Sequence, residues 1–148
     1  MKIKIVEDKT LNENELTIHC KAMTPELESL IQELQTKTIL AYKHSREVLV
    51  NIQDVIFFET DQETVYVHTA KELFETRQRL YELEVLLPNY FMRISKSGIV
   101  NLKKIESIEK ALASSRTIHI QNSHKVIYVS RKYYPVLKSK LNERSFNS

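Results

Sequence analysis

The side chains in this sequence that could do chemistry are mostly basic and hydroxyl groups at the ends of apolar, strand-like stretches. The first group follows Ile94 in the run FMRISKSGIVNL, residues 91–102. The second lies further along the chain in the run VSRKYY, residues 129–134. Lysine, arginine and short hydroxyl side chains donate hydrogen bonds to phosphates and to the edges of bases. The chemistry that these two runs predict is binding to nucleic acid.

The geometry of the first run depends on where its strand ends. A turn directly after Ile94 would release residues 95–97, including the cation Lys96, toward solvent together. A strand that continued would instead place Arg93 and Ser95 on one face. A solvated basic turn without any ligand is the alternative reading of the same residues.

In the second run, Ser130, Arg131 and Lys132 stand where a strand is expected to pass into a helix. Ser130 is expected to cap that helix, whose first amide groups would attract a phosphate. The Arg131 guanidinium can bind a guanine edge through two hydrogen bonds, which lysine imitates poorly. Tyr133 and Tyr134 are expected to pack the helix down rather than to stack on bases.

Other kinds of site find little support in the sequence. The five histidines show neither i,i+4 pairing nor cysteine neighbours, so no metal site is expected. Gly98 is the only glycine, which argues against the glycine-rich loops that hold nucleotide cofactors. Its place beside Lys96 indicates either a backbone with positive φ or an ordinary turn. Since no nucleophile stands with a base, we expect no enzyme, no cofactor and no small-molecule substrate.

Charge divides sharply along the chain. Residues 1–90 carry 10 Lys and Arg against 16 Asp and Glu, whereas residues 91–148 carry 12 against 3. The formal net charge of +3 therefore combines −6 with +9. A basic C-terminal half predicts an acidic partner, and nucleic acid is the first candidate. The alternative is that the basic surface only balances an acidic surface of the same fold. The stretch that contains Lys43, His44 and Arg46 would either extend the basic surface or form a solvated loop.

A small β-β-α segment is expected over residues 1–37. The strands are predicted at Lys2–Val6 and Leu16–Met23, followed by a helix with Thr24 as its N-cap and Pro25 in its first turn. An apolar stripe on that helix would either cover apolar surface of this chain or form a homodimer. The stripe consists of Leu27, Leu30, Ile31 and Leu34.

The elements that must position the basic runs lie in a second domain, residues 38–148. Short strands at close spacing predict a mainly β domain with short helices, so the fold class is α+β. Helices are expected at Arg77–Leu87 and Arg131–Leu141. The expected strands are Ile39–Tyr42, Glu47–Asn51, Val55–Glu59, Thr64–Thr69, Leu73–Thr76, Tyr90–Ile94, Val100–Glu109, Arg116–Gln121 and Lys125–Ser130.

The two basic runs together resemble the signature of the LytTR DNA-binding domain family. The likeness includes Ile105 and Ile108 between the runs and the segment DVIFFE before them, and it covers roughly residues 38–144. It implies a bacterial transcriptional regulator with a multi-stranded, mainly β fold. Such domains insert loops into successive major grooves of duplex DNA, commonly at paired direct repeats, and bend it.

Carried over by position, the resemblance implies base contacts from Lys96 and Arg131. A third contact would come from the loop Asp61–Thr64, through Glu63 or Thr64. Phosphate or support contacts are implied for Arg93, Ser97 and Lys132, and Ser95 is also expected among the DNA-binding residues.

This sequence departs from the family pattern at two of these places. Ser95 stands where many members have histidine, and the third loop carries the acids Asp61 and Glu63. Carboxylates repel phosphates, although they can accept a hydrogen bond from cytosine. The resemblance also implies a structural role for Asn101, which would bond local backbone.

The partners and location follow from the same reading. The chain shows no signal peptide and no apolar run near the ~20 residues that span a bilayer, and its single cysteine, Cys20, fits a reducing compartment. We therefore expect a cytoplasmic protein that binds double-stranded DNA. The resemblance to regulators without a receiver domain implies control by a small membrane protein. The alternative is a basic module that docks an acidic or membrane-associated protein.

Overall fold

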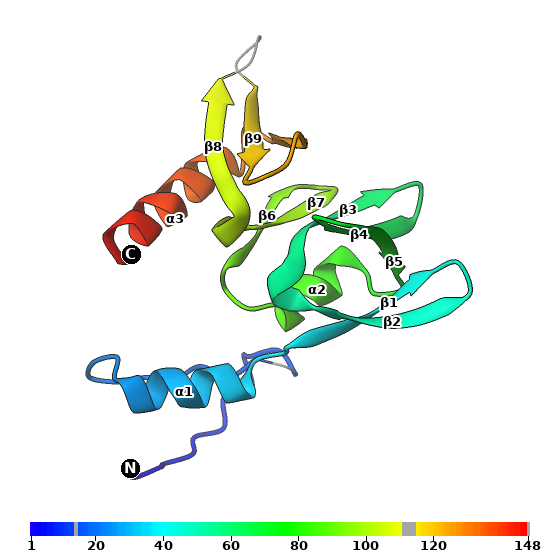
Figure 1. The fold of residues 1–148 in the computed structure, drawn as a ribbon. Helices are drawn as coiled ribbons and strands as arrows, with labels where there is room; N and C mark the ends of the chain where they lie inside the picture. Colours follow the sequence, from blue (N-terminus) through cyan, green and yellow to red (C-terminus); the bar gives the residue numbers. More distant parts are fainter. Residues whose placement is uncertain (14, 111–114, 148) are drawn as a thin grey trace. The chain divides into compact units, whose positions relative to one another are not determined.

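The computed structural model describes residues 1–13, 15–110 and 115–147, and it divides into two compact units (Figure 1). The first unit is Met1–Gln35 and the second is Thr36–Ser148. The dimerisation or regulatory role expected for the N-terminal segment stays a prediction. No helix in the described part of the chain is long and apolar enough to span a membrane.

The first unit contains the helix α1, Pro25–Leu34. Its N-cap is Thr24, whose side-chain oxygen accepts a hydrogen bond from the Leu27 amide at 3.2 Å. Pro25 stands at the start of the helix, and Glu26 and Glu28 lie in its first turn. Their negative charges stabilise the helix there, because the N-terminus is the positive end of the helix dipole. The helix start expected from the sequence is thus confirmed.

The two strands expected before α1 are wrong. The described residues among 1–24 form no strand, and Ile3 and Ile5 are 75% and 85% exposed. Alternation of polar and apolar residues favours a strand only where a neighbouring strand supplies hydrogen bonds and a buried face. Neither Lys2–Val6 nor Leu16–Met23 has such a partner in the structure.

The second unit is built on a seven-stranded antiparallel sheet with the order β2-β1-β5-β4-β3-β7-β6 (Figure 1). The helix α2, Leu80–Leu86, connects β5 to β6. The strands are β1 Thr38–Lys43, β2 Arg46–Asn51, β3 Val55–Asp61, β4 Thr64–Thr69, β5 Leu73–Thr76, β6 Phe91–Ser95 and β7 Gly98–Asn101.

A three-stranded antiparallel sheet follows, with the order β10-β9-β8. Its strands are β8 Ile105–Lys110, β9 Arg116–Ile120 and β10 Val126–Val129, and the helix α3, Tyr134–Asn147, closes the described chain. The mainly β, α+β class expected from the sequence is confirmed.

Two apolar clusters hold this unit together, one on each face of the large sheet. Phe58 and Leu83 belong to the cluster that includes α2, and both are fully buried. Phe57, the neighbour of Phe58, belongs to the other cluster, which joins the large sheet to the small one and to Leu137 of α3. Because adjacent residues of a strand point to opposite faces, the apolar run at the start of β3 is buried on both sides.

The strand expected at Val100–Glu109 is wrong as a single element. The chain leaves β7 at Asn101, makes a 3-10 turn at Leu102–Lys104 and begins β8 at Ile105, in the other sheet. The Asn101 side chain causes the break, because its Oδ1 accepts a hydrogen bond from the Lys103 amide at 2.9 Å. Its Nδ2 also donates to the carbonyl of Val55 at 2.9 Å. Asn101 therefore bonds distant as well as local backbone.

Smaller corrections concern helix starts and the single glycine. Helix α2 begins at Leu80 rather than at Arg77, and α3 begins at Tyr134 rather than at Arg131. Gly98 does not have a positive φ, so the turn beside Lys96 does not depend on a left-handed glycine. Positive φ values occur instead in the described chain at His44, Gln62, Glu63 and Asn122.

A buried histidine links the two sheets. The His68 ring on β4 stacks on Phe57 with 4.1 Å between the ring centroids, and its Nδ1 lies 2.5 Å from Lys125 Nζ. Since an ammonium can only donate, Nδ1 accepts and the ring proton sits on Nε2, which lies 3.3 Å from Glu59 Oε1. Burial first, and the Lys125 charge second, lower the pKa of His68 below its usual range.

We expect stability to depend on pH through His68. Its pKa is lowered in the folded state, so the unfolded chain binds the proton more tightly. The free energy of unfolding should be constant above about pH 7 and should fall as the pH drops below about 6.5. Urea unfolding at pH 7.5, 6.5 and 5.5 measures this, and His68→Gln should flatten the decline. The exposed His124→Gln is the control, and an equal slope in wild type and His68→Gln would contradict the assignment.

Candidate nucleic-acid interface

Two of the three loops expected to contact DNA lie side by side at one end of the large sheet. The β3–β4 turn, Asp61–Thr64, lies at the end of β3, whose other neighbour is β7, with Glu59 paired to Gly98. The Thr60 amide donates a hydrogen bond to the carbonyl of Ser97 at 2.8 Å. Sheet pairing therefore brings the acidic turn next to the turn between β6 and β7, although more than thirty residues separate them in sequence.

The third loop is joined to the same place by another backbone hydrogen bond. The Ser130 amide, at the end of β10, donates to the carbonyl of Ile94 on β6 at 2.9 Å. Ile94 is the last residue but one of β6, close to the β6–β7 turn, and Ser130 directly precedes Arg131. The structure thus brings together the two basic runs of the sequence. The surface formed by residues 61–64, 95–98 and 130–132 is called the three-turn surface below.

Within the β6–β7 turn, two serines fix the backbone and leave the lysine outward. Ser95 Oγ accepts a hydrogen bond from the Ser97 amide at 3.2 Å and lies 3.4 Å from Ser97 Oγ. Lys96 is exposed, and no ion pair of its ammonium is recorded among the described residues. β6 continues through Ser95, one residue beyond the strand end expected at Ile94, and the turn consists of Lys96 and Ser97. The structure therefore has a turn here, but it releases Lys96 and Ser97 without Ser95.

Arg93 holds this turn from behind. Its Nε donates to the carbonyl of Ser95 at 2.7 Å, and one terminal nitrogen donates to the carbonyl of Lys96 at 2.5 Å. The other terminal nitrogen pairs with Glu84 Oε1 of α2 at 2.5 Å. Three directions of the guanidinium are occupied by protein acceptors, so this geometry favours support over a phosphate contact.

Removing Arg93 tests that role. We expect Arg93→Ala to lower the free energy of unfolding by about 1–3 kcal/mol, because charge-assisted hydrogen bonds to two carbonyls are lost. Arg93→Lys should be nearly as unstable, since one ammonium cannot reach three separate acceptors. Urea unfolding measures both variants. If Arg93→Ala is as stable as wild type but its DNA affinity depends less on salt, Arg93 contacts a phosphate instead.

The β3–β4 turn has the backbone of a tight hairpin. Gln62 and Glu63 have φ values of 47° and 72°, the left-handed pair that a type I′ turn requires. Arg79, at the start of α2, donates to the carbonyl of Glu63 at 3.5 Å. Glu63 is exposed and Thr64 is half-buried. Their roles as contacts stay predictions.

The junction between β10 and α3 differs from the helix cap expected at Ser130. The Ser130 carbonyl accepts hydrogen bonds from the amides of Tyr133 and Tyr134, each at 3.1 Å, and α3 begins only after this turn. Ser130 Oγ is buried and has no hydrogen-bond partner within the described chain. Arg131 and Lys132 are exposed in the turn that precedes the helix.

Basic residues elsewhere do not extend this surface. The β1–β2 turn, which holds His44 and Arg46, lies at the opposite end of the large sheet, because Tyr42 pairs with Glu75 and Val65 pairs with Thr76. Lys43 forms an ion pair with Glu72 at 3.3 Å, also at that far end. Of the two readings of this stretch, a solvated loop away from the three-turn surface is the one that the structure has.

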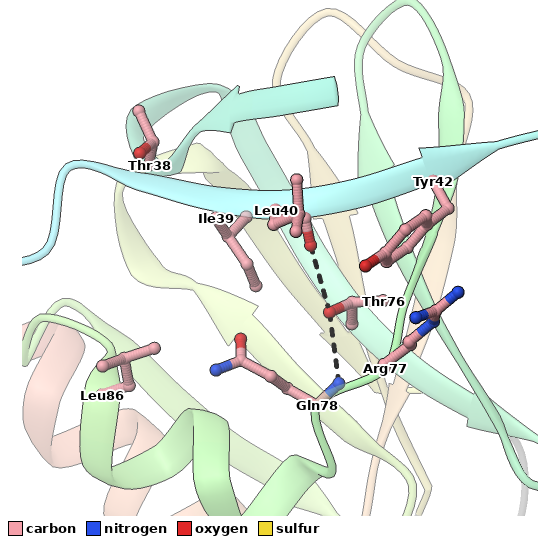
Figure 2. A pocket seen from close by; sticks show the side chains of 8 residues that line it. All are labelled: Thr38, Ile39, Leu40, Tyr42, Thr76, Arg77, Gln78 and Leu86. Carbon is pink, nitrogen blue, oxygen red and sulfur yellow. Dashed lines mark hydrogen bonds between the residues drawn. The ribbon is translucent and has the colours of Figure 1, made fainter. Parts of the chain in front are cut away.

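A surface hollow of about 270 Å³ lies between β1, β5 and α2 (Figure 2). Thr76 Oγ1 donates to the carbonyl of Leu40 at 3.5 Å and accepts from the Gln78 amide at 3.3 Å. The Arg77 guanidinium lies 4.4 Å from the centre of the Tyr42 ring. The lining contains no carboxylate, histidine or cysteine. No cluster of metal-binding side chains was found among the described residues.

Two residues beside the three-turn surface were not predicted from the sequence. Glu84 positions Arg93, and Arg116 lies on β9 opposite Val129, directly before the junction. The position of Arg116 could have been predicted, because a hairpin of the last two expected strands brings its first residue opposite the end of the second strand. No pattern in the sequence identifies Glu84, because its contact depends on how α2 packs.

Comparison with known proteins gives a consistent result. Residues 45–142 match the family described as the LytTr DNA-binding domain. Two HTH-type transcriptional regulators of Staphylococcus aureus, from strains NCTC 8325 / PS 47 and COL, are each 30% identical over 146 residues, covering 96% of this chain and 99% of each relative. A solved LytTr DNA-binding domain from Bacillus cereus is 23% identical, with a TM-score of 0.67 over 72% of this chain and 97% of that one.

Proposed function

This chain belongs to the LytTR DNA-binding domain family of transcriptional regulators, which are not enzymes, and we propose that it binds specific promoter DNA through the three-turn surface. Lys96 and Arg131 contact base edges in successive major grooves of the duplex, and Lys132 contacts a phosphate. Ser95 and Ser97 shape the β6–β7 turn, and Arg93 supports it. The sites are expected to be repeated, as the family resemblance implies.

One observation carries this proposal: two backbone hydrogen bonds join three separate turns at one end of the sheet. They are Thr60 to Ser97 and Ser130 to Ile94. Because both bonds involve backbone at the ends of strands, the spacing of the turns is fixed before DNA binds. Each helix in the described chain is flanked by strands or irregular chain rather than by a second helix, which favours turns as the reading elements.

The energetics follow from charge and from the deformation of DNA. Each phosphate neutralised by lysine or arginine releases counterions, so log affinity falls with log salt by about 0.9 per phosphate. Specificity comes from hydrogen bonds to base edges, each good bidentate pair discriminating by about 1–3 kcal/mol. Bending of the site adds sequence preference at bases that no side chain touches.

A homodimer would suit the repeated sites that we propose. The first unit exposes Ile3, Ile5 and Leu16 extensively, together with Leu34 at the end of α1. Exposed apolar groups of this kind support association with a second copy. Control by a small membrane protein, and residence in the cytoplasm beside the DNA, are implied by the family resemblance and remain part of the proposal.

The test is fluorescence anisotropy with duplex DNA from the gene's own upstream region, against shuffled duplex of equal composition, at two salt concentrations. We expect the native sequence to be favoured by on the order of 10³ or more. Equal, weak and salt-sensitive binding to both duplexes would overturn the proposal. That outcome would favour the rival, a basic module that docks an acidic protein and ignores DNA sequence.

A further inference from the structure

A second hollow, of about 290 Å³, lies beside the three-turn surface. It is lined by Arg116, Val129, Arg131 and Tyr134, from β9, β10 and the start of α3. Arg131 belongs to the three-turn surface, and Val129 directly precedes Ser130, whose amide bonds Ile94. The hollow is therefore continuous with the end of the sheet where the three turns meet.

Arg116 is held at the hollow by its surroundings. It is the first residue of β9, paired with Val129 on one side and with Lys110 on the other. Its guanidinium lies 4.7 Å from the centre of the Tyr134 ring, and one terminal nitrogen donates to the carbonyl of Ser115 at 3.4 Å. An arginine stacked on an aromatic ring keeps donor groups in the plane of its guanidinium.

The charges around the hollow favour an anion. Two of its lining side chains are guanidinium groups, and none is acidic. Glu109, on the neighbouring strand β8, is paired with His119, whose Nε2 lies 2.9 Å from the Glu109 carboxylate. An arginine guanidinium binds phosphate through charge-assisted hydrogen bonds in a fixed geometry.

We propose that this hollow binds a phosphate of the DNA backbone and that Arg116 is the residue that holds it. The inference rests on the proposed function, because the phosphate belongs to the duplex that the three turns read. Arg116 fixes the register of the protein on the DNA without reading sequence, whereas Arg131, on the rim of the hollow, reads a base.

The first test compares Arg116→Gln with Arg46→Gln, which removes the same charge from the opposite end of the sheet. At 150 mM salt we expect Arg116→Gln to bind native and shuffled duplexes each roughly tenfold more weakly than wild type. Raising the salt from 50 to 200 mM should weaken the binding of wild type about 3.5-fold more than the binding of Arg116→Gln, which is the effect of one phosphate contact. Arg46→Gln should match wild type. An Arg116→Gln variant with wild-type affinity and salt dependence would overturn the inference.

Loss of the stack on Tyr134 could unfold Arg116→Gln, so a second test changes the DNA instead. Single phosphates of the native duplex are replaced by neutral methylphosphonates, and wild-type binding is measured at each position. We expect one position where the replacement weakens the binding of wild type more than the binding of Arg116→Lys. The lysine keeps the positive charge but lacks the planar guanidinium with its several donors. If every replacement that weakens wild type weakens Arg116→Lys equally, the inference is wrong. If wild type shows no preference for native sequence, the proposed function itself fails.

Discussion

Replacing Arg131 by alanine is expected to weaken binding to the native duplex by about 1–3 kcal/mol and to remove the preference at one base position. Arg131 is exposed in the turn that the hydrogen bond from Ser130 to Ile94 holds against the β6–β7 turn. Its planar guanidinium fits the two acceptors of a guanine edge, which a lysine ammonium does not match. The measurement is anisotropy with a set of duplexes that vary one base pair at a time.

The matched control for this prediction is the next residue. Lys132 is also exposed, and its ammonium lies 5.5 Å from the centre of the Tyr133 ring. Lys132→Ala should weaken binding to all duplexes alike and should reduce the salt slope by about 0.9, as expected for one phosphate contact. Equal loss of base preference in both variants would contradict the division of roles between the two residues.

The largest effect on stability is expected from Asn101→Ala. Asn101 is 1% exposed, and its side chain bonds the Val55 carbonyl on β3 and the Lys103 amide of the 3-10 turn, both at 2.9 Å. Alanine removes the cap and leaves a carbonyl at the buried residue Val55 without this partner. We expect the free energy of unfolding to fall by about 2–4 kcal/mol. Since domains are stable by only about 5–15 kcal/mol, that is a large share.

The chain contains its own control for that variant. Asn51 caps the 3-10 turn before β3 in the same way, because its Oδ1 accepts a hydrogen bond from the Gln53 amide at 3.0 Å. Asn51 is exposed, and within the described part of the chain its side chain bonds only the nearby Gln53 amide. Asn51→Ala should therefore cost only about 0.5–1 kcal/mol in urea unfolding. If the two variants lost the same free energy of unfolding, the hydrogen bond from Asn101 to Val55 would contribute nothing beyond the cap.

Much of the second unit could be predicted because its strands bury alternate residues. Each expected strand between Ile39 and Thr76 overlaps one in the structure, since alternation there coincides with a real buried face. The hairpin at Gln62 and Glu63 followed from polar residues between two strand patterns. The strands before the two basic turns end at Ser95 and Val129, each within one residue of the ends expected at Ile94 and Ser130.

The remaining features depend on contacts between residues distant in sequence. Lys2–Val6 alternates as a strand does, but alternation supplies no pairing partner. The break at Asn101 is decided by one side chain, and hydrophobic periodicity does not register it. The support that Arg93 receives from Glu84 requires the packing of α2, which no local pattern specifies.

The location of the DNA on the protein surface is measured most directly by backbone amide NMR of the isotope-labelled protein, titrated with its native upstream duplex. We predict that the signals of residues 61–64, 95–98 and 130–132 shift together on titration, while those of the β1–β2 turn around Arg46 stay in place. Shifts at the β1–β2 turn with the three turns unchanged would contradict the three-turn surface as the DNA-binding site.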